Sequence, residues 1–117
     1  MASIIEKETG LASERKKISG VLVKRMKIGM RLQADPTIIY GMGKSFVGNL
    51  KKNDLLKDGE YNTYTRKGLP PTPISLPSRD SIHAALNPDI GSELYFVAKG
   101  DGGHYFSKDL KEHQQAV

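Results

Sequence analysis

Glu6 is the residue whose type and surroundings first point to chemistry, and it lies in the stretch ASIIEKETG. The apolar Ile4 and Ile5 indicate that a helix over this stretch is largely buried, so Glu6 is expected to be partly desolvated. Desolvation would raise the pKa of Glu6 from about 4.3 toward about 6–7, where a carboxyl group can act as a general acid near neutral pH. Small residues share its side of the helix and would leave room for a ligand: Ala2, Ser3, Thr9 and Gly10.

The plainer interpretation of Glu6 is a solvated position on an exposed helix face, and the sequence leaves both interpretations open. Glu8 lies on another face of the same helix, and Glu14 lies near the start of the next helix. We interpret these two glutamates as solvated or as capping residues.

A second set of polar side chains lies in RLQADPTIIYG. Gln33, Asp35 and Thr37 together offer hydrogen-bond donors and acceptors, which the hydroxyl groups of a sugar require. Tyr40, further along the same segment, could pack against the apolar face of a sugar ring. The alternative is structural, since Asp35 followed by Pro36 is also an ordinary helix start.

A third set lies in EYNTYTRKGLPP, which leads into a proline-rich loop. Tyr61 and Tyr64 flank Asn62 and Thr63, so aromatic faces stand beside amide and hydroxyl groups. This combination suits a sugar-binding site. The alternative is a loop whose aromatic side chains serve only to pack it.

Composition narrows the classes of function. The chain has 117 residues, which fits one domain, and a net charge of +5, which favours nucleic acid, an acidic membrane face or an anionic polymer as partner. The absence of cysteine excludes disulfides, thiolate metal sites and cysteine nucleophiles. The histidines lack paired metal-ligand spacing, so no metal site is expected. The basic runs ERKK and VKRMK are most simply solvated, and we expect no nucleic-acid partner.

These side chains must be positioned by an α+β fold that is mostly helical and has one small β-hairpin. Apolar periodicity and capping residues predict the helices, and two aromatic-rich runs around Gly-Asp-Gly-Gly predict the hairpin. The first two expected helices are residues 2–9, ended by Gly10, and residues 13–29, capped by Ser13. A third helix is expected to begin at Asp35, and a single helical turn is expected over residues 53–59. A further helix is expected to be capped by Asp80 and to stop before Pro88, and the last is expected to start within residues 107–117.

Taken in order, these segments resemble the catalytic domain of the YceG-like endolytic murein transglycosylases along essentially the whole chain. The segments that carry the resemblance are ASIIEKETG, SERKKISGVLVKRMKIGMRLQADPTIIYG, YNTYTRKGLPPTPISLPSRDSIHAALNPD and LYFVAKGDGGHYFS. Their order and spacing make the resemblance specific. It implies a single catalytic domain over residues 1–117, with a fold related to the lysozyme-like transglycosylases.

The resemblance implies a lyase that cuts peptidoglycan glycan strands internally, between N-acetylmuramic acid and N-acetylglucosamine. Such an enzyme leaves 1,6-anhydro ends and needs no cofactor. Its catalytic acid and base would be the first glutamate of the EKET motif, which is Glu6. The sugar-binding side chains would then be Gln33, Asp35, Thr37, Tyr40, Tyr61, Asn62, Thr63 and Tyr64.

The resemblance also implies a longer protein, with a membrane anchor and a LysM-like region ahead of this domain. Neither is found in the sequence, and we interpret the chain as a fragment without a membrane span. The full-length protein is expected at the extracytoplasmic face of the bacterial cytoplasmic membrane. Peptidoglycan strands are the expected partner, and proteins of cell-wall synthesis and division are further candidates.

Two other interpretations stay open. A hydrolase would use Asp35 as a second carboxylate and would release reducing ends instead of anhydro ends. A non-catalytic module that binds or scaffolds peptidoglycan would keep its function when Glu6 is replaced by glutamine.

Overall fold

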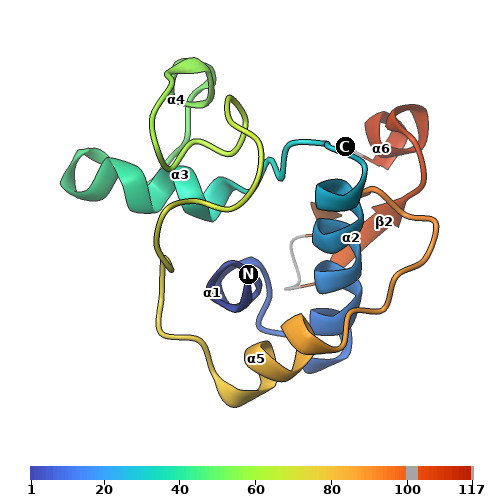
Figure 1. Ribbon diagram of the computed structural model, residues 1–117. Coiled ribbons are helices and arrows are strands. Elements are labelled where there is room, and N and C mark those ends of the chain that lie inside the picture. Colours follow the sequence, from blue (N-terminus) through green and yellow to red (C-terminus); the bar gives the residue numbers. More distant parts are fainter. Residues whose placement is uncertain (100–102, 117) are drawn as a thin grey trace.

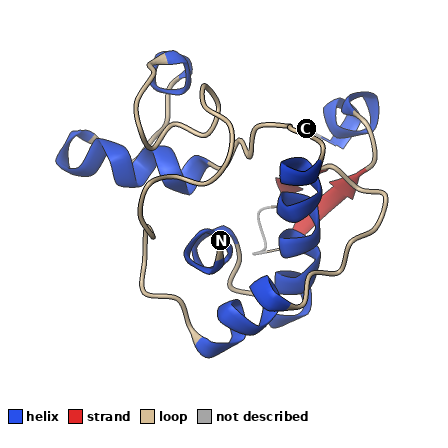
Figure 2. Ribbon diagram, in the orientation of Figure 1, coloured by secondary structure: helices blue, strands red, loops and turns tan. Residues whose placement is uncertain are grey.

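The computed structural model describes residues 1–99 and 103–116, and it confirms the predicted fold class of helices with one small antiparallel sheet (Figure 1, Figure 2). Within these ranges, none of the helices combines the length and the hydropathy that a membrane span needs. In chain order the elements are α1 (Ala2–Glu8), η1 (Ala12–Glu14), α2 (Arg15–Lys27), α3 (Asp35–Met42), η2 (Gly43–Ser45), α4 (Lys52–Leu56), α5 (Arg79–Leu86), β1 (Tyr95–Ala98), β2 (His104–Ser107) and α6 (Leu110–Ala116).

Helix α1 lies at the centre of the molecule. Figure 1 shows it end-on, with α2 and α5 on one side and the loop that leads to α5 on the other. Ile4 and Ile5 are at most 1% exposed, and they belong to one core cluster with Ile18 and Leu22 of α2. Each such buried side chain contributes about 1.5–3 kcal/mol to stability. The core therefore forms around the helix that carries Glu6 and Glu8.

Two residues of the connection from α2 to α3 reach the core, although most of the connection is exposed. Leu32 is 0% exposed and Ala34 is 1% exposed. Figure 1 shows α3 and α4 set apart from the hairpin, with the loop after α4 running back toward α5. Helix α3 also contacts α1. The polar segment at the start of α3 is thereby brought close to α1.

The hairpin forms where the aromatic-rich runs predicted it. Strands β1 and β2 pair antiparallel, with Tyr95 opposite Ser107. Phe96 and Phe106 pack against the core cluster, and α6 contacts both strands. Most of the predicted Gly-Asp-Gly-Gly turn, residues 100–102, lies outside the described residues.

The helix starts differ from the predicted ones. Ser13 lies within η1, and α2 begins without a side-chain cap. Asp35 is the first residue of α3 and not its N-cap. Helix α5 is capped by Ser78, whose Oγ accepts a hydrogen bond from the Ser81 N–H at 3.2 Å, and Asp80 lies in the first turn. A cap requires a particular backbone conformation before the helix, and residue type alone does not fix that conformation.

Candidate active site

Glu6 is held at the junction of α1 and α5. Its Oε1 accepts hydrogen bonds from the Ser78 N–H at 2.7 Å and from the Ser81 hydroxyl at 2.9 Å. The Ser78 backbone bond, followed by the side-chain bonds from Ser78 and Ser81, lowers the pKa of Glu6 to about 2. The predicted upward shift of this pKa is therefore wrong. Hydrogen bonds to the ionised carboxylate outweigh desolvation, because Glu6 is only partly buried.

Ser3, one of the small residues that share a face with Glu6, contacts another segment of the same chain. The Ser3 Oγ accepts a hydrogen bond from the Ile74 N–H at 3.0 Å, and the Ser3 carbonyl accepts one from the Ser75 hydroxyl at 3.0 Å. The segment that leads into α5 thus runs along this face of α1. The space was predicted for a ligand, and beside Ser3 and Glu6 it is occupied by the chain's own residues 74–81.

Glu8, the last residue of α1, has the environment that was predicted for Glu6. It is half-buried, and burial is the main cause that raises its pKa to about 7. The negative charge of Asp35 raises this pKa further, and the positive charge of Arg25 lowers it. The interpretation of Glu8 as solvated or capping is wrong, because Glu8 is half-buried and burial shifts its pKa.

A signal for Glu8 was present in the sequence. Glu8 lies four residues after Ile4 and three after Ile5, so all three side chains share one side of a helix. That side is the apolar and buried one. A glutamate at such a position must either pair or change its pKa.

Arg25 of α2 is the positive group of this region, and it is 4% exposed. Its Nε donates to the Leu94 carbonyl at 2.8 Å, and its Nη1 donates to the Leu32 carbonyl. The guanidinium carbon lies 5.6 Å and 5.5 Å from the ring centroids of Tyr95 and Phe96. Within the described residues, no carboxylate oxygen lies within 4.0 Å of Arg25. Its charge therefore acts on Glu8 over a longer distance.

Hydrogen bonds join the second and third polar segments that the sequence singled out. The Gln33 N–H donates to the Thr63 carbonyl at 3.1 Å, and the Ala34 N–H donates to the Thr63 Oγ1 at 2.9 Å. The Tyr64 hydroxyl donates to the Asp35 Oδ1 at 2.5 Å. Segments 33–35 and 63–64 therefore form one unit. The two hydrogen bonds that involve side chains each join residues 29 positions apart along the chain.

Three of the predicted sugar-binding residues turn out to be internal. Thr37 is 0% exposed, Thr63 is 2% exposed, and their Oγ1 atoms lie 2.9 Å apart in a hydrogen bond. Asn62 is 5% exposed. In this conformation these three side chains cannot contact a sugar directly, because they are buried inside the protein.

Asn62 in particular organises the turn that carries the tyrosines. Its Nδ2 donates to the carbonyls of Leu55 at 3.0 Å and Lys57 at 2.7 Å. Its Oδ1 accepts from the N–H groups of Tyr64 at 2.8 Å and Thr65 at 3.1 Å. The amide therefore ties the end of α4 to the tyrosine segment. The conformation of Tyr64 depends on this side chain.

The other predicted sugar-binding residues reach the surface. Gln33, Asp35 and Tyr40 are exposed, and Tyr61 and Tyr64 are half-buried. The rings of Tyr40 and Tyr61 meet edge to face, with centroids 5.0 Å apart. These five side chains can contact a ligand without a change of backbone.

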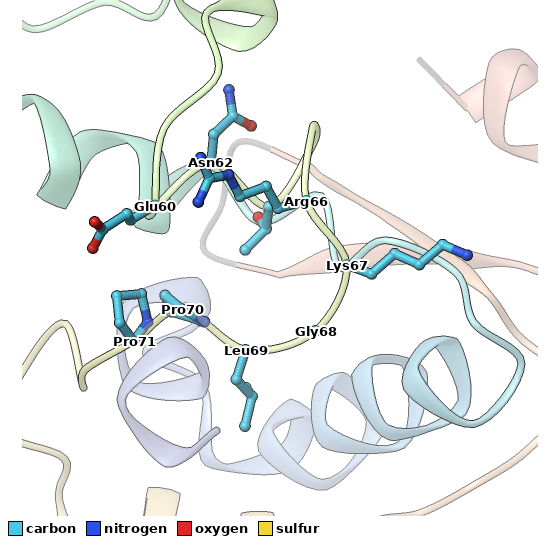
Figure 3. A pocket seen from close by; sticks show the side chains of 9 residues that line it. Glu60, Asn62, Arg66, Lys67, Gly68, Leu69, Pro70 and Pro71 are labelled. Atoms are coloured by element: carbon cyan, nitrogen blue, oxygen red, sulfur yellow. The ribbon is translucent and has the colours of Figure 1, made fainter.

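Two recesses border the same region. One, of about 440 Å³, lies between α3 and the 54–62 segment and includes Gly41 and Tyr61 in its wall. The other, of about 340 Å³, is bordered by Glu60, Arg66 and the loop that ends at Pro71 (Figure 3). Neither recess has Glu6 or Glu8 in its wall. They flank the tyrosine segment, and the carboxylates in their walls are those of Asp54, Asp58 and Glu60.

Glu14 also differs from its interpretation as solvated or capping. Its Oε2 accepts from the His104 N–H at 2.9 Å, and its Oε1 lies 3.1 Å from the His104 Nδ1. The two side chains are 13% and 7% exposed. Glu14 therefore fastens the hairpin to the turn before α2 and lies outside the region of Glu8.

The half-buried Glu8 at the end of the central helix, whose pKa is raised by burial and influenced by Asp35 and Arg25, is a candidate general acid in a small helical domain. The chain belongs to the YceG-like family, whose model matches residues 1–117.

Relatives of known name agree with this membership. The chain is 47% identical over 116 residues to the endolytic murein transglycosylase of Bacillus subtilis, covering 99% of this chain and 32% of that protein. It is 34% identical over 122 residues to the endolytic murein transglycosylase of Streptococcus pneumoniae serotype 2, covering 100% of this chain and 22% of that protein. A crystal structure of a YceG-like protein from Listeria monocytogenes has a TM-score of 0.92 at 44% identity, covering 100% of this chain and 38% of that one. The chain spans well under half the length of each relative.

Proposed function

We propose that this chain is the catalytic domain of an endolytic murein transglycosylase and that Glu8 is its general acid and base. The substrate class comes from the two relatives of that name, and the YceG-like family match covers the whole chain. The assignment of the acid comes from the geometry around α1. It replaces the prediction from the sequence, which placed the acid at Glu6.

The raised pKa of Glu8 carries this proposal. With a pKa of about 7, Glu8 is protonated in a large part of the molecules at neutral pH. With its pKa lowered to about 2, Glu6 is ionised at that pH. A general acid must hold a proton at the working pH. Glu8 meets that requirement and Glu6 does not.

The first chemical step is breakage of the glycosidic bond. Protonated Glu8 donates its proton to the oxygen between N-acetylmuramic acid and N-acetylglucosamine. The bond from C1 of the muramic acid to that oxygen breaks, and its electron pair stays with the leaving sugar. Positive charge then develops at C1 and the ring oxygen.

The second step closes a ring. Glu8, now a carboxylate, takes the proton from the C6 hydroxyl of the same muramic acid, and O6 bonds to C1. The product carries a 1,6-anhydro end, no water is consumed, and Glu8 has its proton again. One carboxylate is enough because the nucleophile, the C6 hydroxyl, belongs to the substrate itself. Its closeness to C1 gives it a high effective concentration, so no second catalytic group is needed to supply or hold a nucleophile.

The glycan contacts are proposed on the exposed part of the joined segments. Gln33, Asp35 and Tyr40 offer polar and aromatic groups there, and the half-buried Tyr61 and Tyr64 contact Tyr40 and Asp35 respectively. The net charge of +5 favours approach to an anionic wall polymer. We propose in addition that the full-length protein works at the extracytoplasmic face of the membrane, anchored there, with cell-wall synthesis or division proteins as partners.

A hydrolase is the second candidate, and one observation favours it. The charge of Asp35 acts on Glu8, so two carboxyl groups lie in one region, as a two-carboxylate mechanism requires. Water would then attack C1, and the products would carry reducing ends. The nature of the product ends separates the two reactions.

The test is a digest of purified peptidoglycan, read by mass spectrometry, with the wild-type chain beside Glu8→Gln and Glu6→Gln. The same three forms are made in a chain extended to the length of the relatives. Anhydro-ended internal fragments from wild type and Glu6→Gln, and none from Glu8→Gln, are expected. Reducing ends would identify the hydrolase, and loss of products with Glu6→Gln alone would return the acid to Glu6. If no form yields products, the chain is a binding module.

A further inference from the structure

Residues 43–57, which we call the tip segment, include no buried residue although five of their side chains are apolar. The tip segment comprises η2, the loop after it and α4. Its apolar side chains are Phe46, Val47, Leu50, Leu55 and Leu56. Val47 is 78% exposed, Leu56 is 66% exposed, and none of the five belongs to the core cluster. Single exposed apolar residues are ordinary, but a whole segment of them left in contact with water indicates a partner.

Hydrogen bonds to the backbone hold both ends of the tip segment. The Ser45 hydroxyl donates to the Met42 carbonyl at 2.7 Å, and the Asp54 Oδ2 accepts from the Lys51 N–H at 2.8 Å at the start of α4. Asn62 binds the carbonyls at the end of α4, as described above. Figure 1 shows α4 at the opposite side of the molecule from α5. The apolar side chains of the tip segment therefore stay available to a partner outside the domain.

Positive charge lies among these apolar side chains. The tip segment contains four lysines, which are Lys44, Lys51, Lys52 and Lys57. All four are exposed, and none takes part in an ion pair among the residues that the structure describes. The carboxylate of Asp54 is the only one in the tip segment, and it is engaged by the Lys51 N–H. The tip segment thus presents apolar side chains and excess positive charge together.

This combination fits a surface that is anionic on the outside and apolar beneath, which describes an acidic lipid bilayer. Lysine stems lie along the apolar region while their ammonium groups reach the headgroup phosphates. A hydrated wall polymer would attract the lysines but would offer no apolar environment to Val47 and Leu56. The cores of protein interfaces are depleted in lysine, so four lysines among five apolar side chains do not favour a protein partner.

We propose that the tip segment binds the anionic lipid surface of the membrane and holds the domain against it. The inference goes beyond the proposed reaction and involves neither Glu6 nor Glu8. Its setting, the membrane face, is the location given under the proposed function. In an anchored protein the second contact forms at a high effective concentration, so even weak binding by the tip segment would orient the domain. The domain would then act on glycan strands close to the membrane.

The test is co-sedimentation of the chain with vesicles of phosphatidylcholine mixed with phosphatidylglycerol. We expect binding to the mixed vesicles, much weaker binding to pure phosphatidylcholine vesicles, and loss of binding as added salt screens the charges. Lys51→Glu combined with Lys52→Glu should weaken binding to the mixed vesicles by about 10-fold or more. Val47→Asp should weaken it by about 5-fold, because a charged group replaces an apolar one.

Matched control variants lie outside the tip segment. Lys16→Glu combined with Lys27→Glu makes the same change of net charge on exposed positions of α2, and Leu76→Asp alters an apolar side chain that is 96% exposed. Each control should change binding by less than about 2-fold, since these positions do not face the bilayer. Thermal unfolding of every variant checks that the fold is intact.

A second readout reports on one position at a time. The chain contains no cysteine, so a single introduced cysteine can carry an environment-sensitive fluorophore. The emission of a label on Val47→Cys should move to shorter wavelength when mixed vesicles are added, because the label enters an apolar region. The emission of a label on Leu76→Cys should not move.

Three results would overturn the inference. Equal losses of binding in the tip and control variants would mean that net charge alone attracts the chain. A label at position 47 that responds to purified peptidoglycan and not to mixed vesicles would assign the tip segment to the wall polymer. If that label already emits at the shorter wavelength in a chain extended to the length of the relatives, before vesicles are added, another segment of the protein covers the tip segment.

Failure here is distinguishable from failure of the proposed function. The peptidoglycan digest contains no vesicles, so its products do not depend on lipid binding. Vesicle binding in turn should be the same in wild type and Glu8→Gln. An inactive chain that still binds mixed vesicles through the tip segment would refute the reaction and support the membrane contact.

Discussion

Two glutamates in the last turn of one short helix are in opposite states, and the contrast comes from what surrounds each. At the junction of α1 with α5, Glu6 receives two hydrogen bonds and its pKa falls to about 2. Two residues further on, Glu8 is desolvated and its pKa rises to about 7. One residue type on one helix thus yields a structural anchor and a candidate acid. The lesson is that donors and burial decide the chemistry of a carboxylate, and residue identity does not.

The largest expected effect separates the two glutamates by activity. Glu8→Gln removes the proposed acid and should lower the rate of anhydro-product release by about 10²–10⁴-fold. Glu6→Gln should change the rate by less than about 10-fold, because Glu6 lies outside the proposed chemistry. Initial rates on purified peptidoglycan measure both. Equal losses in two folded variants would contradict the contrast.

The next effect is on stability at alkaline pH. Because the pKa of Glu8 is raised from 4.5 to about 7 on folding, wild type loses stability as the pH rises through that window. Glu8→Gln has no such charge to bury, so it should be more stable than wild type at pH 8 by about 1–3 kcal/mol. Near pH 4 the two proteins should be similar. Urea unfolding at the two pH values measures the difference, and a variant that is less stable at both would contradict it.

A smaller effect of opposite sign belongs to Glu6. Its pKa is lower in the folded state, so its contribution is present above pH 4.5 and is lost as the pH falls from 4.5 through about 2. Solvent screening limits the contribution to the order of 1 kcal/mol. Glu6→Gln should therefore reduce stability at pH 7 and flatten the acid limb of the stability profile. An unchanged acid limb would show that the two serine bonds do not hold Glu6 in solution.

The smallest expected effect sharpens the structural role of Glu6. Ser81→Ala removes one of its donors and should cost about 0.5–1.5 kcal/mol at pH 7. In a double-mutant cycle with Glu6→Gln, the two losses should not add, since both break the same bond. Additive losses would mean that Ser81 stabilises α5 independently of Glu6.

Patterns within a few residues of each other were enough to predict the local features of this protein. Apolar spacing located Ile4 and Ile5 in the core, and the aromatic runs located the hairpin, because these patterns depend on neighbours within a few residues. The sequence also contained an unused signal, the placement of Glu8 on the side of α1 that carries Ile4 and Ile5. Three of the eight predicted sugar contacts proved internal, since a polar residue type does not reveal that a turn encloses it.

Tertiary structure alone decided which glutamate holds a proton. The donors to Glu6 lie 72 and 75 positions away along the chain. Burial raises the pKa of Glu8 most, and the two charges that act on it, those of Asp35 and Arg25, come from two other helices. A pKa is the sum of desolvation, hydrogen bonds and nearby charges, and all three depend on which distant segments the fold brings together.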